Sequence, residues 1–198
     1  MNKVKVSQDF LYEYLQEHHF ILSVLTKHMG VSAGIVKRCF SHDLNAQGKP
    51  MKFSAANIEK MNLALSQIAD EMRGCLLTYG SDQVEKKRDG STYDPALITP
   101  LREKVGRFFK LKGLVENVLG WNAKRYNAVL SAPSSKVYGQ VTADDVQRIN
   151  TEIMAVAGVL GSYEVVADGN DTISTEKERY NKRCKKLSIC TICRMKRQ

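Results

Sequence analysis

Residues 22–41, LSVLTKHMGVSAGIVKRCFS, decide how this chain folds. Gly30 stands between two short runs in which apolar side chains recur at helical spacing. These apolar positions are Leu25, Met29, Val31, Val36 and Phe40. A glycine ends a helix well because it adopts the left-handed conformation that a Cβ disfavours. The stretch therefore predicts a helix over about 21–28, a tight turn at Gly30 and a second helix over about 32–40.

The same arrangement returns later in the chain. Around Gly120, apolar and aromatic residues stand at the spacings seen in the first stretch, namely Val115, Leu119, Trp121, Tyr126 and Leu130. The offset is 90 residues there, and a longer apolar pattern over 58–72 returns 88 residues later over 146–160, with Asn62 matched by Asn150. Amphipathic helices often match by chance. Several helices and a glycine in register indicate an internal duplication.

Each copy is predicted to contain only helices. In the first copy, helices are expected from Ser7, over 21–28, over 32–40, and from Ser54 to near Gly80. In the second copy they are expected over 101–109, 111–118 and 122–130, with Thr99 and Pro100 starting the first. Thr142 and Asp145 form a capping-box pattern at the start of the last helix.

The predicted fold class is all-α, with two tandem domains of four to five helices. The first copy is expected over 1–80 and the second over 99–168. The segment 81–98 between them is polar and lacks periodicity, which is typical of a linker. Residues 169–198 form a basic, cysteine-containing tail that is expected to be partly helical.

Two helices set across each other by a short glycine turn have the geometry of a helix-turn-helix. At these residues the chain resembles the lambda-repressor-like (Cro/repressor type) helix-turn-helix family, over about 7–78 and again over 99–165. The family prefers Ala four residues before the turn glycine, where this chain has Thr26 and Glu116. The resemblance implies a transcriptional regulator of phage or mobile-element type, which binds double-stranded DNA with the third helix of each copy in the major groove.

The resemblance also implies which residues face DNA. In the first copy the matching positions are Ser32, Ala33, Gly34, Lys37, Arg38 and Ser41. Lys37 and Arg38 would read sequence, because both donate to O6 and N7 of guanine. In the second copy the matching positions are Asn122, Ala123, Lys124, Asn127 and Ser131, of which the asparagines would pair with adenine. Lys27 and Lys112 would contact phosphates, which position a protein without specifying sequence.

Each of these residues also has a plainer interpretation. Lys37 and Arg38 also suit the solvated face of any helical protein. Asn122 is better explained as a helix N-cap than as a base reader. Trp121 and Tyr126 are better explained as core residues than as groups that stack on bases. The repeated arrangement, rather than any single residue, favours DNA binding.

The charge is concentrated at one end of the chain. The 198 residues carry a net +9, and residues 169–198 supply +6 of it. The tail cations most relevant to phosphate contact are Lys182, Arg183, Lys185 and Lys186. We expect a basic arm that follows the phosphate backbone, with a solubilising tail as the alternative. A helix lying on a membrane surface is disfavoured, because the apolar stripe of the tail is thin and lacks Trp and Phe.

The cysteines do not predict a metal site. Cys190 and Cys193 have the spacing of half a zinc site, and Cys184 is the nearest third thiol. A closed zinc site needs four ligands, and the tail contains no His. We therefore expect no metal and no cofactor.

Several function classes are disfavoured by the sequence. We expect no enzyme and no small-molecule substrate, since the chain has no phosphate-binding glycine loop, HExxH motif or nucleophile elbow. No membrane segment is expected, because the longest apolar run, 153–161, is too short to cross a bilayer. The first ten residues lack the apolar centre of a secretory signal, which favours a cytoplasmic protein.

Two hypotheses remain at this stage. The first is a sequence-specific regulator that binds double-stranded DNA, with two recognition units on one chain and a homodimer as an open alternative. The second is a helical structural or protein-interaction module that keeps a helix-turn-helix architecture without reading DNA. Exposure of the third helices, with Lys and Arg around them, would favour the first hypothesis.

Overall fold

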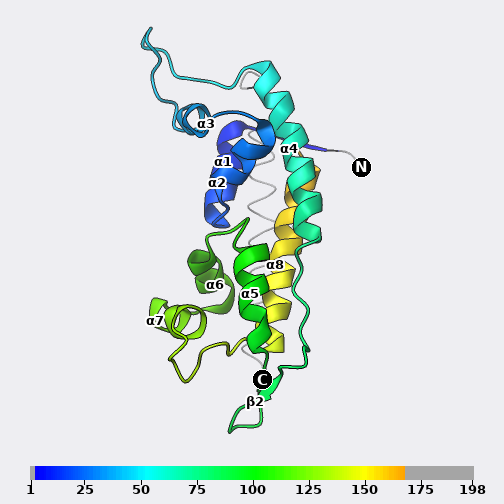
Figure 1. Ribbon diagram of the computed structural model, residues 1–198. Helices are drawn as coiled ribbons and strands as arrows, with labels where there is room; N and C mark the ends of the chain where they lie inside the picture. Colours follow the sequence, from blue (N-terminus) through cyan, green and yellow to red (C-terminus); the bar gives the residue numbers. More distant parts are fainter. Residues whose placement is uncertain (1–2, 168–198) are drawn as a thin grey trace, which may run out of the picture.

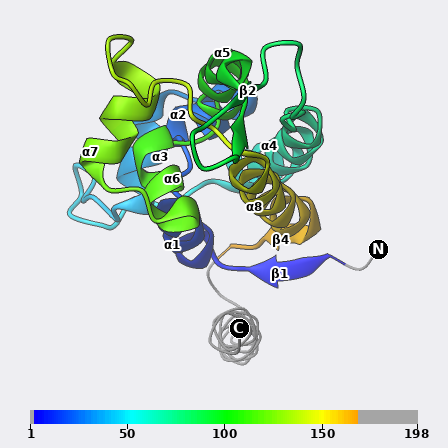
Figure 2. The ribbon, with the colours of Figure 1, turned by 90° about the horizontal axis from the view of Figure 1, so that it is seen from below.

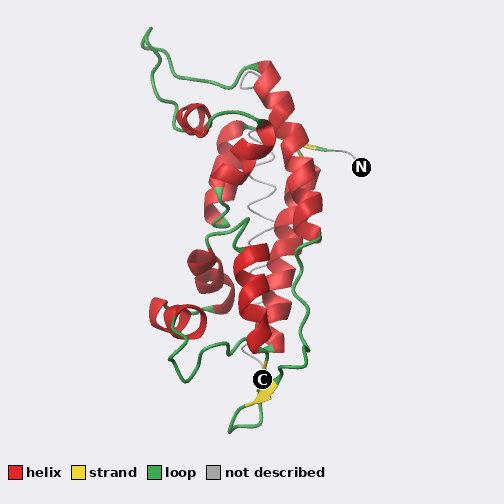
Figure 3. Ribbon diagram, viewed as in Figure 1, coloured by secondary structure: helices red, strands yellow, loops and turns green. Residues whose placement is uncertain are grey.

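The computed structural model describes residues 3–167, most of which are helical (Figures 1 and 3). The first half contains α1 (Gln8–Glu17), α2 (Leu22–Met29), α3 (Ala33–Phe40) and α4 (Ala55–Arg73). The predicted caps are confirmed: the Ser7 hydroxyl accepts the N–H of Phe10 at 3.1 Å, and the Ser54 hydroxyl accepts that of Asn57 at 3.3 Å. These oxygens satisfy backbone donors that the first turn of a helix leaves open.

The end of α4 differs from the prediction. The helix ends at Gly74, well before the expected end near Gly80. The N–H of Gly74 bonds to the carbonyl oxygens of Asp70 and Glu71, which closes the last turn. The residues that follow leave the helix to reach Leu77, whose backbone is held by a side chain of the second half. Tertiary contacts, rather than the apolar pattern, therefore set this boundary.

The second half repeats the helix order with shorter and less regular pieces. It contains a 3-10 turn η1 (Pro95–Leu97), α5 (Ile98–Pro100), a π-helical turn η2 (Leu101–Val105), α6 (Leu111–Leu119), α7 (Ala123–Tyr126), a second π-helical turn η3 (Asn127–Ser131) and α8 (Ala143–Ser162). The first helical stretch begins at Pro95 and not near Thr99, because the Asp94 carboxylate accepts the N–H of Ala96 at 3.1 Å. The capping box of Thr142 and Asp145 is confirmed at the start of α8.

The described residues also contain strands that the sequence did not predict. β1 (Val4–Val6) pairs in parallel with β4 (Tyr163–Val165), so the two ends of the described chain meet. β2 (Glu85–Lys86) and β3 (Thr92–Tyr93) form an antiparallel pair within the segment expected to be a featureless linker. The fold is therefore largely helical, as predicted, with two small sheets added.

Asp94 fixes the end of segment 81–98 to the body of the protein. Its carboxylate accepts the N–H groups of Gly80 at 3.2 Å and Ser81 at 2.9 Å, and the Ser81 hydroxyl at 2.6 Å. The residue is fully buried. Burial alone would raise the pKa of Asp94, but the hydrogen bonds from Ser81, Gly80 and Ala96 lower it below its ordinary value. The carboxylate stays charged and ties both ends of the segment together.

The two halves contact each other directly at Phe20 and Phe109. These residues form an antiparallel bridge, and their rings meet edge to face at 6.1 Å between centroids. The N–H of Ile21 bonds to the carbonyl of Phe108, and the N–H of Lys110 bonds to the carbonyl of His19, each at 2.8 Å. These bonds hold the residues just before α2 beside the residues just before α6.

A second pair of equivalent contacts crosses between the halves. The Asn62 side chain both donates to the carbonyl of Val165, at 3.0 Å, and accepts its N–H, at 2.7 Å. The Asn150 side chain makes the same two bonds to Leu77, at 2.8 and 2.9 Å. The two asparagines are 88 residues apart, and so are the two residues that they hold. Each half therefore holds the segment that follows the long helix of the other half. We call these contacts the asparagine clamps.

The long helices α4 and α8 pack along one side of the molecule (Figure 1). α3 and α7 lie on the other side, toward opposite ends (Figure 1). Seen from below, α7 lies on the side of the molecule away from α4 (Figure 2). Buried side chains from both halves form one continuous core, which includes Phe20, Met61, Phe109 and Leu160. The predicted division into domains 1–80 and 99–168 stays a prediction, since the halves share this core.

Candidate nucleic-acid interface

Two glycine turns position the candidate recognition helices. Gly30 (φ 61°, ψ 32°) ends α2, and Gly120 (φ 70°, ψ 21°) ends α6, both in the left-handed conformation predicted for the first. Thr26, before the first turn, is buried and donates its hydroxyl to the carbonyl of Ser23 at 2.9 Å. Glu116 is exposed, so the corresponding position of α6 buries no polar group. Both departures from the family pattern are thereby accommodated.

The outer face of α3 is open to solvent. All of the residues expected there are exposed, namely Ser32, Ala33, Gly34, Lys37, Arg38 and Ser41. The opposite face is buried in the core through Val36, Cys39 and Phe40. Ile35 was not among the residues predicted for this face, but it is also exposed and lies among the polar residues of α3. The helix thus offers a mixed surface of small, cationic and apolar side chains.

Local contacts fix the start and the cationic end of α3. The Ser32 hydroxyl accepts the N–H of Ile35 at 3.4 Å and so caps the helix. Arg38 donates through Nε to the carbonyl of Gly34 at 3.3 Å, which directs the side chain back along the exposed face. Gly34 has no Cβ, and open space surrounds the place where one would stand. A base pair or phosphate can therefore approach this part of the helix closely.

The outer face of α7 and η3 is exposed as well. Asn122, Ala123, Lys124, Asn127 and Ser131 all lie on it. The Asn122 side-chain oxygen accepts the N–H of Arg125 at 2.9 Å, so its predicted role as an N-cap is confirmed. Trp121 is buried and Tyr126 packs against the core, as expected from their positions after Gly120.

Arg125 is a cation at this surface that sequence reasoning missed. It is exposed, and its guanidinium lies over the Trp121 ring at 4.9 Å from the centroid. Such stacking orders a long side chain at modest cost in conformational freedom. Trp121 lies just before the N-cap Asn122, and the first turn of α7 carries Arg125 back over its ring. α7 therefore carries two exposed cations, Lys124 and Arg125.

The candidate phosphate contacts are also at the surface. Lys27 lies on α2 and Lys112 in the first turn of α6, and both are exposed. They stand on the helices that precede α3 and α7. In a helix-turn-helix that is where contacts with the DNA backbone are made.

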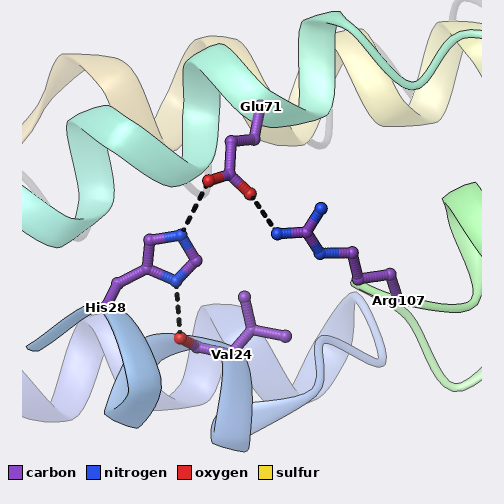
Figure 4. Close-up of polar contacts among 4 residues, drawn as sticks. All are labelled: Val24, His28, Glu71 and Arg107. Carbon is purple, nitrogen blue, oxygen red and sulfur yellow. Dashed lines mark hydrogen bonds and ion pairs between the residues drawn. The ribbon is translucent and has the colours of Figure 1, made fainter. Parts of the chain in front are cut away.

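A hydrogen-bonded network holds α2 against the rest of the protein (Figure 4). His28 contacts the carbonyl of Val24 through Nδ1 at 2.8 Å and the carboxylate of Glu71 through Nε2 at 3.1 Å. Arg107, from the second half, donates to the other carboxylate oxygen at 2.7 Å. The hydrogen bond from His28, with the charge of Arg107, holds the pKa of Glu71 below its ordinary value. The network links α2 to α4 and to the second half.

Some predicted residues lie outside the described part of the chain. These are the tail cations Lys182, Arg183, Lys185 and Lys186 and the thiols Cys184, Cys190 and Cys193. Within residues 3–167, no group of His, Cys, Asp or Glu is arranged to hold a metal ion. Within the same range, every helix is too short or too polar to cross a membrane.

Comparison with known proteins gives no relative. No family model matches the chain, and neither the curated proteins nor the solved structures contain a match.

Proposed function

We propose that this protein is a sequence-specific, double-stranded DNA-binding regulator with two lambda-repressor-like helix-turn-helix units in one chain. The proposal rests on the contrast between the buried inner face and the exposed outer face of α3. Its inner face is fixed in the core by Val36 and Phe40, whereas Lys37 and Arg38 stand on an exposed outer face. A positioned helix with exposed cations is what major-groove recognition requires.

The second unit supports the proposal because it presents an equivalent helix. α7 follows a left-handed glycine turn, as α3 does, and carries exposed Lys124, Arg125 and Asn127. The asparagine clamps join the halves reciprocally, so α3 and α7 are proposed to meet two half-sites in inverted orientation. The two faces differ, so the half-sites differ in sequence, with guanine expected in the half read by Arg38.

One chain would then bind a whole site without dimerising. The asparagine clamps and the Phe20–Phe109 bridge fix the relative position of the units. Half-sites are expected about one helical turn apart, roughly 34–36 Å, as for two-fold helix-turn-helix dimers. The basic segment 169–198 is proposed to add phosphate contacts of equal strength on every sequence.

Selection of bound duplexes from a random pool tests the proposal directly. We expect one bipartite site with unlike halves and a fixed spacing. Inserting one base pair between the halves shifts them by about 3.4 Å and about 34–36°, so binding to the selected site should fall sharply. Enrichment of no sequence would refute the proposal. Equal binding to sites with altered spacing would show that the units act separately.

Arg38→Ala supplies the residue-level test. It should reduce the preference for the selected duplex over a random one by about 5- to 100-fold, the range expected for loss of a bidentate guanine contact. Lys60→Ala is the matched control, because Lys60 is an exposed cation on α4, away from the proposed interface. Equal effects of the two substitutions would show that Arg38 does not read sequence.

A helical interaction module is the second candidate function. Leu63 on α4 and Met154 on α8 are large apolar side chains exposed by 63% and 44%. These residues lie on the two long helices, away from α3 and α7. A chain that binds no DNA, but whose association with another protein is lost in Leu63→Ser, would favour this function.

A further inference from the structure

A hairpin projects from the end of α3, and the proposed function does not yet use it. Residues 43–51 leave the helix and reach beyond the body of the molecule, between α3 and α4 (Figures 1 and 3). The N–H of Met51 bonds to the carbonyl of Asp43, and the N–H of Asn45 bonds to that of Lys49, each at 2.8 Å. Leu44 and Pro50 are bridged between these bonds. The segment is thus a formed structure rather than a loose connection.

Its tip is ordered by a side chain. The Asn45 side-chain oxygen accepts the N–H groups of Gln47 at 2.9 Å and Lys49 at 3.0 Å. Gly48 (φ 71°) supplies the left-handed residue that closes the turn. The tip therefore holds its shape without support from the core.

The base of the hairpin is tied to the helices beside it. The N–H of Asp43 bonds to the carbonyl of Arg38 at 3.0 Å. The His42 side chain contacts the Asp9 carboxylate of α1 through Nε2 at 2.8 Å. The direction of the hairpin is therefore fixed relative to α3 and to its reading residue Arg38.

The second half shows that connecting the helices does not require this projection. There the corresponding connection, 132–141, folds back onto the protein. The N–H of Gly139 bonds to the carbonyl of Val129 at 3.0 Å, and Val141 is fully buried. A Cβ at Gly139 would lie 3.0 Å from the side chain of Pro95, so this backbone packs closely. Only the first unit extends its loop into solvent.

The exposed side chains of the hairpin have the chemistry of a minor-groove reader. Every residue of 43–50 is exposed, and Leu44 is exposed by 66%. The same exposed hairpin carries Asn45, Gln47 and Lys49. Proteins that bind the minor groove insert apolar side chains such as Leu, and read the groove with Asn, Gln, Lys and Arg. The major groove facing α3 is followed along the duplex by a minor groove.

We propose that hairpin 43–51 enters the minor groove beside the half-site bound by α3, and discriminates A·T from G·C pairs there. This inference rests on the proposed function. It makes the complete site three-part: a major-groove contact for each unit and a minor-groove contact beside the first unit alone. The minor groove differs between the pair types chiefly by the N2 amino group of guanine. An inserted Leu44 and an amide from Gln47 would be obstructed by that group.

Inosine substitution separates the two grooves. An I·C pair has the minor-groove groups of A·T and the major-groove groups of G·C, since inosine lacks the N2 amino group. The full chain is measured on its selected site, with A·T pairs beside the first half-site replaced by I·C or by G·C. We expect I·C to bind like A·T and G·C to bind about 5- to 10-fold more weakly. Equal losses for I·C and G·C, or no preference at these positions, would overturn the inference.

A double variant assigns the effect to the hairpin. Leu44→Ser with Gln47→Ala changes two exposed side chains and keeps the backbone bonds of the turn. It should reduce the difference between I·C and G·C to less than about twofold, while the base preference in the α3 half-site persists. Leu63→Ser is the matched control, because Leu63 is an equally exposed leucine on α4. An unchanged difference in the double variant would refute the inference.

The two proposals fail in different ways. If no duplex is selected from the random pool, the proposed DNA-binding function is wrong. A second outcome is that a bipartite site is selected while I·C and G·C pairs bind equally, or while the double variant leaves their difference unchanged. In that case only the role of the hairpin is wrong. An effect of the double variant on a protein partner, with DNA binding unchanged, would assign the hairpin to protein contact instead.

Discussion

The asparagine clamps predict that the two halves unfold together, and that each clamp stabilises both. In Asn150→Ala, the N–H and the carbonyl of Leu77 lose their side-chain partner at a position that is 5% exposed. A typical hydrogen bond contributes about 0.5–1.5 kcal/mol net, and an unsatisfied buried group costs about 1–3 kcal/mol. Loss of both hydrogen bonds to Leu77 should therefore lower the free energy of unfolding by about 2–4 kcal/mol. Asn62→Ala should cost a similar amount, because it removes the equivalent bonds to Val165.

The chain provides two probes for this experiment. Trp121 is the single tryptophan and is buried in the second half, so its fluorescence reports that half alone. Far-ultraviolet circular dichroism reports the helices of both halves. In urea, the two signals should give one coincident transition, and Asn62→Ala in the first half should shift the Trp121 transition as well. The control is Asn127→Ala, an exposed asparagine whose loss should change the free energy of unfolding by less than about 0.5 kcal/mol.

Two results would contradict this reasoning. The first is a pair of separate transitions, with Trp121 fluorescence unaffected by Asn62→Ala, which would mean that the halves fold independently. The second is a cost below about 0.5 kcal/mol for both clamp substitutions, which would mean that water replaces the side-chain bonds.

Three further predictions concern the interface and the network behind it. Lys27→Ala should weaken binding to selected and random duplexes by the same factor at one salt concentration, and a loss confined to the selected duplex would contradict its role as a phosphate contact. If five cations neutralise phosphates, affinity should fall several hundred-fold over a fourfold rise in salt, with a log–log slope near −4.5, and a flat response would contradict DNA binding. These cations are Lys27, Lys37, Arg38, Lys112 and Lys124. The folded-state pKa of Glu71 is lowered from 4.5, so its contribution to stability is present above pH 4.5 and is lost as the pH falls through the lowered value. Glu71→Gln should flatten the free energy of unfolding over that acid range, and an unchanged pH profile would show that its contacts with His28 and Arg107 do not matter.

Local signals in the sequence predicted local structure well. Ser7, Ser54 and Thr142 cap helices as their side chains indicated, because the acceptor and the donor it satisfies lie within three residues. Gly30 was recognised as a left-handed helix end for a similar reason. The duplication was inferred from spacing alone, and the division of the chain into two tandem domains stays a prediction.

Features that depend on distant residues were not predicted. The match of Asn62 with Asn150 was visible, but their bonds to Val165 and Leu77 join residues 103 and 73 positions apart. Asp94 looked like part of a polar linker, and only its burial shows that it anchors that segment. The hairpin at 43–51 was not foreseen, because it holds a single bridge, Leu44 with Pro50, and has no apolar alternation that would signal paired strands. Exposure of α3 and α7 likewise follows from packing and not from their composition.

The exchange of closing segments between the halves has a consequence for synthesis of the chain. When the ribosome has made the first hundred residues, α4 is complete, but Asn62 has no Val165 to hold and β1 has no β4 to pair with. Contacts this far apart in the chain close late, because a long loop must be ordered first. In the nascent first half, Asn62 and β1 therefore lack their partners until residue 165 leaves the exit tunnel. A chain stopped after the first half would keep Asn62 and β1 without these partners.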